Sequence, residues 1–181
     1  MFQSERIEVI PLRIEGVFGL ATNQKQDERG TLTRLWEENL TQSKFSIKQI
    51  SIVTNPKPLT LRGLHFQTSP YSENKIIYCI SGKIFEVVLD LRIHSKTYGE
   101  HLTVETGLTS DLQGLVVPID CAHGYLTLAP NSSLIYFIDN FYSAESARGV
   151  LWNDPNLEIN WPANPSVISK RDSSWPQLKN L

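Results

Sequence analysis

Short runs of β-branched and aromatic residues, separated by turn residues, recur along the chain and constrain its fold most strongly. The clearest runs span residues 45–54, 75–92, 101–106, 114–130 and 133–142. SGK at 81–83 and APNSS at 129–133 interrupt apolar runs in the way that tight hairpins do. This pattern predicts an all-β sandwich or barrel, and a jelly roll is the arrangement that closes sheet edges at this size.

Helical signals are few. They are confined to LTRLWEENLTQ (32–42) and to the segment after SKRD (169–172), where a serine three residues before an aspartate predicts a capping box. The tail at 152–165 is rich in Pro, Asn and Trp, so we expect it to wrap the barrel as an ordered loop.

Length and composition narrow the class of protein. At 181 residues we expect a single domain over residues 1–181. The formal net charge of −2 gives no electrostatic reason for a nucleic-acid partner, and no apolar window is long enough to span a membrane. Cys79 and Cys121 each lie in an apolar run, which favours buried thiols in a reducing compartment and a cytoplasmic location.

The segment LRGLHFQ (61–67) contains one of the four histidines and carries the first candidate for chemistry. Alternate residues of a regular strand share a face. The two predicted sets are Arg62, Leu64 and Phe66 on one face, and Gly63, His65 and Gln67 on the other. Small and polar groups on one face predict a cavity rather than a tight apolar core.

His65 itself allows three interpretations. It can be a hydrogen-bonded core histidine, a metal ligand, or a general base whose far nitrogen is fixed by a carboxylate. A metal site in such a barrel usually needs a His-x-His pair, but position 67 is Gln and His123 is the only partner candidate, because His94 and His101 lie in or beside a polar turn. Spacing alone does not name the carboxylate.

Six motifs appear in an order and spacing that resemble the dTDP-4-dehydrorhamnose 3,5-epimerase family of nucleotide-sugar epimerases. They are DERG (27–30), LRGLHFQ (61–67), KIIYCISGKIFEVVLDLR with SKTYG (75–99), VPIDCAHGY (117–125), WNDPNLEINWP (152–162) and SKRD (169–172). The resemblance covers nearly the whole chain and implies a cupin-type jelly roll.

The resemblance also implies a reaction. A 4-keto sugar has acidic protons on carbons 3 and 5, and epimerisation needs a base on one face, an acid on the other and a cation at the oxyanion. Carried over by position, His65 is the base, Asp172 the carboxylate behind it, Lys75 the oxyanion donor and Tyr136 the acid. The high intrinsic pKa of a phenol suits Tyr136 to that role.

The same resemblance implies contacts with a nucleotide-sugar substrate. Arg62 and His123 are expected at the sugar or pyrophosphate, Arg29 and Gln49 at the nucleotide, and Tyr142 at the sugar. No metal and no other cofactor is expected. The family forms homodimers that exchange an N-terminal strand, for which residues 5–20 are suited.

Four positions depart from the family pattern. Leu32 replaces an aromatic residue, Arg34 a glutamate, Ser51 an asparagine and Asp120 a glycine. The first three concern nucleotide binding, so the sequence leaves open the nucleotide, the sugar and whether one carbon or two are inverted. A non-catalytic sugar-nucleotide binder and a metal-dependent cupin enzyme are the alternative hypotheses.

Overall fold

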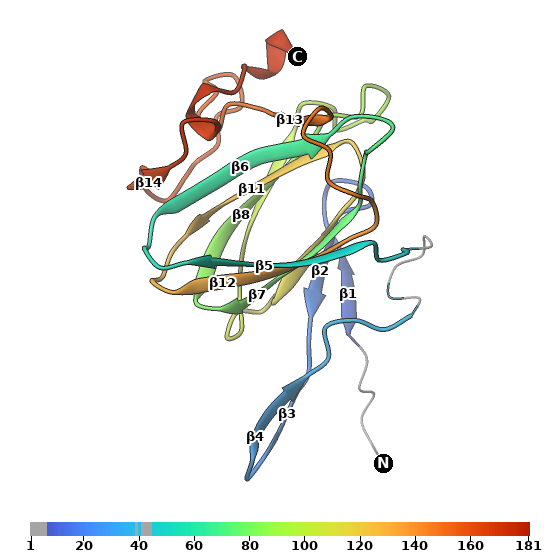
Figure 1. Ribbon diagram of the computed structural model, residues 1–181, viewed down its shortest axis with the longest axis vertical. Coiled ribbons are helices and arrows are strands. Elements are labelled where there is room, and N and C mark those ends of the chain that lie inside the picture. Colours follow the sequence, from blue (N-terminus) through green and yellow to red (C-terminus); the bar gives the residue numbers. More distant parts are fainter. Residues whose placement is uncertain (1–6, 39, 41–44) are drawn as a thin grey trace.

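Two six-stranded β-sheets face each other in the computed structural model, which describes residues 7–38, 40 and 45–181 (Figure 1). The strands pair antiparallel, except for the parallel pairing of β14 with β6. A two-stranded hairpin extends from one end of the sheets, and the carboxyl-terminal segment lies at the opposite end (Figure 1). The all-β jelly-roll prediction is confirmed.

The first sheet has the order β1-β2-β10-β7-β12-β5, and the second has the order β13-β6-β11-β8-β9 with β14 beside β6. The first contains Glu8–Pro11 (β1), Phe18–Ala21 (β2), Gly114–Val117 (β10), Lys75–Ser81 (β7), Ser132–Ile138 (β12) and Gln49–Asn55 (β5). The second contains Ala147–Gly149 (β13), Thr60–Gln67 (β6), Cys121–Thr127 (β11), Lys83–Asp90 (β8), His101–Gly107 (β9) and Val167–Ile168 (β14). The hairpin is Gln24–Asp27 (β3) and Gly30–Thr33 (β4), and two short 3-10 helices span Asp172–Ser174 (η1) and Leu178–Asn180 (η2).

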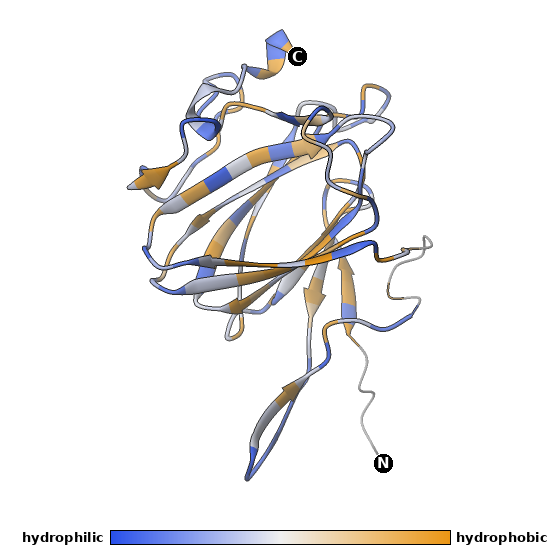
Figure 2. Cartoon of the chain, in the orientation of Figure 1, coloured by the Kyte–Doolittle hydropathy of each residue, from blue (hydrophilic) through white to orange (hydrophobic). Residues whose placement is uncertain are grey.

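Apolar side chains fill the space between the sheets and also cover both outer faces. The central cluster includes Ile77, Val88 and Leu115, all fully buried. The segment around Leu35 and Trp36 packs on the outer face of the first sheet, and residues 150–161 pack on the second. Figure 2 shows hydrophobic residues concentrated in the strands, whereas the β3–β4 hairpin is mostly hydrophilic. The ordered loop predicted at 152–165 is therefore confirmed as a cover of the barrel.

The two predicted hairpins at 81–83 and 129–133 are wrong. Residues 81–83 connect β7 of the first sheet to β8 of the second, and residues 128–131 connect β11 back to β12. The two crossings touch, because a Cβ at Gly82 would lie 2.3 Å from Ser132 Oγ, and Gly82 has φ of +74°. A glycine that permits this close approach between two connections looks the same in the sequence as a glycine in a hairpin turn, which is why the prediction failed.

The predicted helix at 32–42 is also wrong over the residues described. Residues 32 and 33 belong to β4, residues 34–37 have no regular structure, and 39 and 41–44 lie outside the described residues. The apolar side chains of Leu35 and Trp36 are used to cover the sheet. After SKRD the chain forms 3-10 turns rather than an α-helix, although the Asp172 N–H donates to Ser169 Oγ at 3.0 Å, the bond that a capping box requires. No helix in the described part of the chain has the length and hydrophobicity needed to cross a bilayer.

A fully buried carboxylate organises the connection between β8 and β9. Asp90 accepts hydrogen bonds from the Arg92 guanidinium at 2.7 and 2.8 Å and from the hydroxyls of Ser95 and Thr97 at 2.6 and 2.7 Å. Burial alone would raise the pKa of Asp90, but these donors outweigh burial and hold it well below its usual range.

Replacing Asp90 with Asn is expected to lower the free energy of unfolding at pH 7 by about 3 kcal/mol, because Arg92 loses its buried partner. A depressed pKa in the folded state contributes stability above the unfolded pKa of about 3.9, and this is lost as pH falls toward the folded value. The difference in unfolding free energy between the Asp90→Asn variant and the unmodified protein should therefore be smaller at pH 3 than at pH 7. Urea unfolding at both pH values measures it, with exposed Asp111→Asn as control; an equal cost at both would contradict the assignment.

Candidate active site

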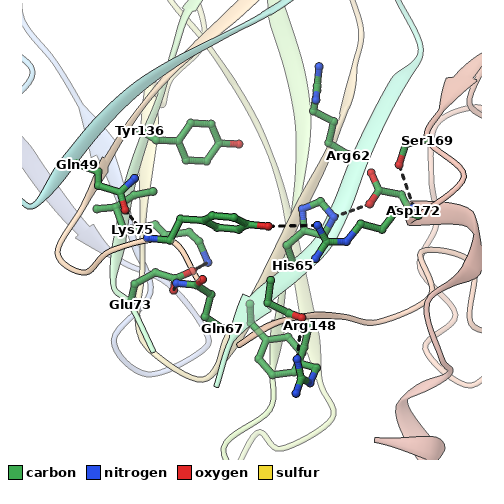
Figure 3. A pocket seen from close by; sticks show the side chains of 15 residues that line it. Gln49, Arg62, His65, Gln67, Glu73, Lys75, Tyr136, Arg148, Ser169 and Asp172 are labelled. Carbon is green, nitrogen blue, oxygen red and sulfur yellow. Dashed lines mark hydrogen bonds and ion pairs between the residues drawn. The ribbon is translucent and has the colours of Figure 1, made fainter. Parts of the chain in front are cut away.

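A cavity of about 350 Å³ opens between the two sheets and the carboxyl-terminal segment. This volume is within the range of small-molecule sites. The lining includes Gln49 of β5, four residues of β6, Lys75 of β7, Tyr136 of β12, Tyr142, and the segment 169–172 (Figure 3). Residues more than 120 positions apart in the sequence thus meet at one site.

A bulge in β6 sets the direction of its side chains. His65 is paired with His123 of β11, but Arg62 is paired with Tyr125, so three steps on β6 oppose two on β11. Gly63 occupies the bulge with φ of +129°, and a Cβ there would lie 2.4 Å from the Gly124 Cα. Glycine is therefore required for the close approach of the two strands.

The bulge corrects the predicted assignment of faces. Arg62 lines the cavity together with His65 and Gln67, although strict alternation separates it from them. Phe66 packs against the same outer cluster as Leu64, as alternation predicts, and also borders the cavity. Gly63 faces the backbone of β11 rather than the cavity.

His65 is held by a carboxylate from outside both sheets. Its Nε2 lies 2.6 Å from Oδ1 of Asp172, whose side chain is 7% exposed, and Trp175 Nε1 donates to the same oxygen at 3.3 Å. Trp175 fits closely over Gly149, where any side chain would collide with it. Burial raises the pKa of Asp172, but hydrogen bonding and charge interaction with His65, with help from Trp175, leave it lowered. An ionised Asp172 fixes the Nε2–H tautomer and leaves Nδ1 free to accept a proton.

Lys75 and Tyr136 approach the cavity from the first sheet. Lys75 is paired with Ile138 across β7 and β12, so Tyr136, two residues before Ile138, lies on the same face. Glu73 Oε1 lies 2.8 Å from Lys75 Nζ, and both side chains are largely buried. Burial raises the pKa of the Tyr136 phenol well above its usual value, and nearby Tyr125 and Glu86 raise it further. Tyr136 is therefore a protonated donor at neutral pH.

Three further predicted residues also reach the cavity. Arg62 Nε donates to Asn55 Oδ1 at 3.0 Å. Gln49 accepts a hydrogen bond from the Tyr142 N–H, and Arg171 donates to the Tyr142 hydroxyl at 3.4 Å. The Tyr142 side chain remains exposed at the mouth.

Two predicted residues lie elsewhere. His123 is buried behind the cavity lining, with its Nε2 2.7 Å from Glu86 Oε2; burial lowers its pKa despite that carboxylate. Arg29 is on the projecting β3–β4 hairpin, where it pairs with Asp27 and lines a separate hollow. The structure does not bring Arg29 into the cavity of its own chain.

Sequence reasoning missed Glu73, Arg148 and Arg171 as lining residues. Glu73 lies two residues before Lys75, and that spacing on an extended segment was the available signal. Arg171 lies within the SKRD motif that supplied Asp172. Nothing in the sequence around Arg148 distinguishes it.

Within the described residues, no group of three or more His, Cys, Asp or Glu side chains is arranged to hold a metal ion. His65 and His123, the pair considered for a metal, are each bonded to a different carboxylate. Both cysteines are free and buried, as predicted.

A jelly roll that places a histidine of one sheet, bonded to a carboxylate of the carboxyl-terminal segment, at one cavity with a lysine and a protonated tyrosine of the other sheet has the groups that epimerisation beside a ketone needs. A sequence profile for dTDP-4-dehydrorhamnose 3,5-epimerase matches residues 11–180. The chain belongs to this family, and the predictions of family and of isomerase activity are confirmed.

Individual relatives are similar over nearly their whole length. The dTDP-4-dehydrorhamnose 3,5-epimerase of Sinorhizobium fredii is 34% identical over 99% of this chain and 90% of its own. The crystal structure of the Bacillus anthracis enzyme, with TDP and PPi bound, has a TM-score of 0.89 at 31% identity, covering 95% of this chain and 99% of that one. The Legionella pneumophila enzyme, solved with dTDP-4-keto-L-rhamnose, has a TM-score of 0.89 at 25% identity, covering 96% and 94%.

Replacing Asp172 with Ala is expected to abolish the tautomer preference of His65. Because Asp172 accepts from Nε2, the neutral ring carries its proton there, and without that acceptor both tautomers should be populated. Nitrogen-15 NMR of the His65 ring at alkaline pH measures the ratio. Lys170→Ala, an exposed neighbour in the same segment, is the control; an unchanged ratio in the Asp172 variant would mean that another group orients the ring.

Proposed function

We propose that this protein inverts carbon 3, carbon 5 or both of a dTDP-linked 4-keto-6-deoxyhexose through an enolate, as a step in deoxysugar biosynthesis. The observation that carries the proposal is the His65–Asp172 pair, 2.6 Å apart, at a cavity that Lys75 and Tyr136 enter from the other sheet. The proposed reaction needs no cofactor, because the ketone itself stabilises the carbanion.

The chemistry follows from these positions. His65 Nδ1 takes the proton from the carbon next to the ketone, and the C–H electron pair becomes the C=C bond of the enolate while the C4 oxygen becomes an oxyanion. Lys75 donates to that oxyanion. Tyr136 then returns a proton to the opposite face of the same carbon, which restores the ketone with inverted configuration. Exchange with solvent reprotonates the tyrosine and deprotonates the histidine.

The charge of the cavity favours a diphosphate-linked sugar. Arg62, Lys75, Arg148 and Arg171 line it, against the two carboxylates Glu73 and Asp172, each of which is already paired. The diphosphate of a nucleotide sugar supplies the anion that such a lining attracts.

The three departures in nucleotide-contact positions lie outside this lining. Leu32 is 71% exposed on β4, Arg34 pairs with Glu37 at 3.7 Å, and Ser51 is opposite Tyr136 on β5. These three replacements leave the proposed catalytic residues intact and concern how the nucleobase of the substrate is held.

We further propose a homodimer of one-domain subunits in the cytoplasm. The β3–β4 hairpin projects from the sheets (Figure 1), and exposed Leu32, Ile50 and Ile52 offer apolar surface on it and on edge strand β5. Arg29 does not line the active-site cavity of its own chain. In the proposed dimer it would contact substrate in the cavity of the second copy. The nucleotide-sugar substrate and the buried free thiols support the location.

Exchange of solvent hydrogen at carbons 3 and 5 tests the two-sided mechanism. His65→Ala should slow exchange by at least about 100-fold, because the base is lost. Tyr136→Phe should keep exchange within about tenfold while slowing inversion by about 100-fold, because the enolate still forms and only the opposite-face proton donor is missing. Deuterium incorporation and product configuration are followed by NMR.

Exposed His94→Ala is the control for loss of a histidine and should match the unmodified protein. Equal losses of exchange and inversion in Tyr136→Phe would contradict the assignment of separate faces. Absence of exchange with every nucleotide form of the substrate would overturn the proposed function.

Nucleoside diphosphates are expected to raise the melting temperature because they bind the cationic lining of the native state. At 100 times the dissociation constant the shift should be about 5–10 °C for a chain of this size. Thermal-shift measurements compare dTDP, UDP and unphosphorylated thymidine. A thymidine shift as large as that of dTDP would contradict a diphosphate-dominated site.

A further inference from the structure

A buried carboxylate lies directly behind the cavity lysine. Glu73 precedes β7, its side chain is 5% exposed, and its Oε1 lies 2.8 Å from Lys75 Nζ. The Lys75 side chain is itself only 11% exposed. Figure 3 shows Glu73, Lys75 and Gln67 grouped in one region of the cavity, with His65 and Asp172 in another.

The second oxygen of Glu73 is also fixed. Gln67 Nε2 lies within hydrogen-bond distance of Glu73 Oε2, of the Tyr71 carbonyl at 2.9 Å and of the Phe141 carbonyl at 3.1 Å, three acceptors for its two hydrogens. Gln67 Oε1 accepts from the Ser143 N–H at 2.7 Å. One amide therefore joins Glu73 to the segment that carries Tyr142. Glu73 cannot turn away from Lys75 without breaking this network.

Stability alone does not account for such a pair. Withdrawing two charges from water costs as much as their attraction returns, and a well-packed apolar pair is often as stable. What the ion pair supplies is a fixed ammonium in a cavity that also holds Arg62, Arg148 and Arg171. Without an anion beside it, the Lys75 ammonium would be repelled by these guanidiniums and free to change rotamer.

We propose that Glu73 is the positioning residue for the epimerisation, holding the Lys75 ammonium in place for the oxygen at carbon 4. This inference rests on the role proposed above for Lys75. Glu73 touches no reacting atom; it acts through Lys75, and Gln67 holds it at the distance that the ion pair requires.

Glu73→Gln tests the charge without changing the size of the side chain. We expect solvent exchange at carbons 3 and 5 of dTDP-linked 4-keto-6-deoxyglucose to slow about 10- to 30-fold in kcat, with KM within twofold. Glu73→Asp keeps the charge and should recover most of the loss. A larger loss in the Asp variant than in the isosteric Gln variant would indicate a packing role and overturn the proposal.

A double-mutant cycle shows whether Glu73 acts through Lys75. If it does, Glu73→Gln should slow exchange by no more than twofold in a Lys75→Met background. Multiplicative effects would overturn the proposal. Slow exchange in Lys75→Met with unchanged exchange in Glu73→Gln overturns this inference alone, whereas normal exchange in Lys75→Met also removes the proposed oxyanion role.

Glu105→Gln is the matched control, since Glu105 is also paired with a lysine, Lys83, but at an exposed position on β9. It should leave exchange unchanged. Melting temperatures are recorded for each variant. If Glu73→Gln alone does not fold, the cycle is run with Glu73→Asp in its place. The small loss of kcat expected from the shorter side chain should then disappear in the Lys75→Met background, and a loss that persists there would overturn the proposal.

Discussion

The chemistry of this fold depends on one steric constraint, the contact between Gly63 and the backbone of β11. Strand β6 has one residue more than its partner over this stretch, and the excess is absorbed where the two strands come closest. Arg62 and His65 are thereby turned toward the same cavity. A side chain at position 63 would separate β6 from β11 and would move His65 relative to the lining residues of the other sheet.

The buried carboxylates at and behind the cavity are each paired with a cationic or histidine side chain, and the pairing follows from burial. Asp172 bonds His65, Glu73 bonds Lys75, and Glu86 bonds His123. A buried carboxylate without a partner lowers the free energy of unfolding by roughly several kcal/mol, so each of these carboxylates is bonded to a donor. The arginines of the lining keep donors to spare, and the cavity is left with an excess of positive charge for a phosphorylated ligand.

The sequence was sufficient for those features that depend on local pattern or on motifs. Repeated β-branched runs predicted the all-β fold, and the motif resemblance identified His65, Lys75, Tyr136 and Asp172, which meet at one cavity. The features that failed depend on partners far along the chain. A glycine that permits a crossing between sheets, such as Gly82, has the same local signature as one in a hairpin, and the bulge at Gly63 exists only relative to β11. Glu73 was overlooked because its spacing from Lys75 indicates a shared face at most, and does not show that the carboxylate is buried.

The position of Asp172 in the chain has a consequence for biosynthesis. Strands β1 to β12 end at Ile138, whereas the carboxylate that bonds His65 comes more than 30 residues later, on a segment held by β14 and by Trp175 over Gly149. Because a chain emerges from the ribosome amino end first, most of both sheets can pair before Asp172 has been added. His65 can therefore meet its carboxylate only after residue 172 has been added, when every strand from β1 to β12 has already been synthesised.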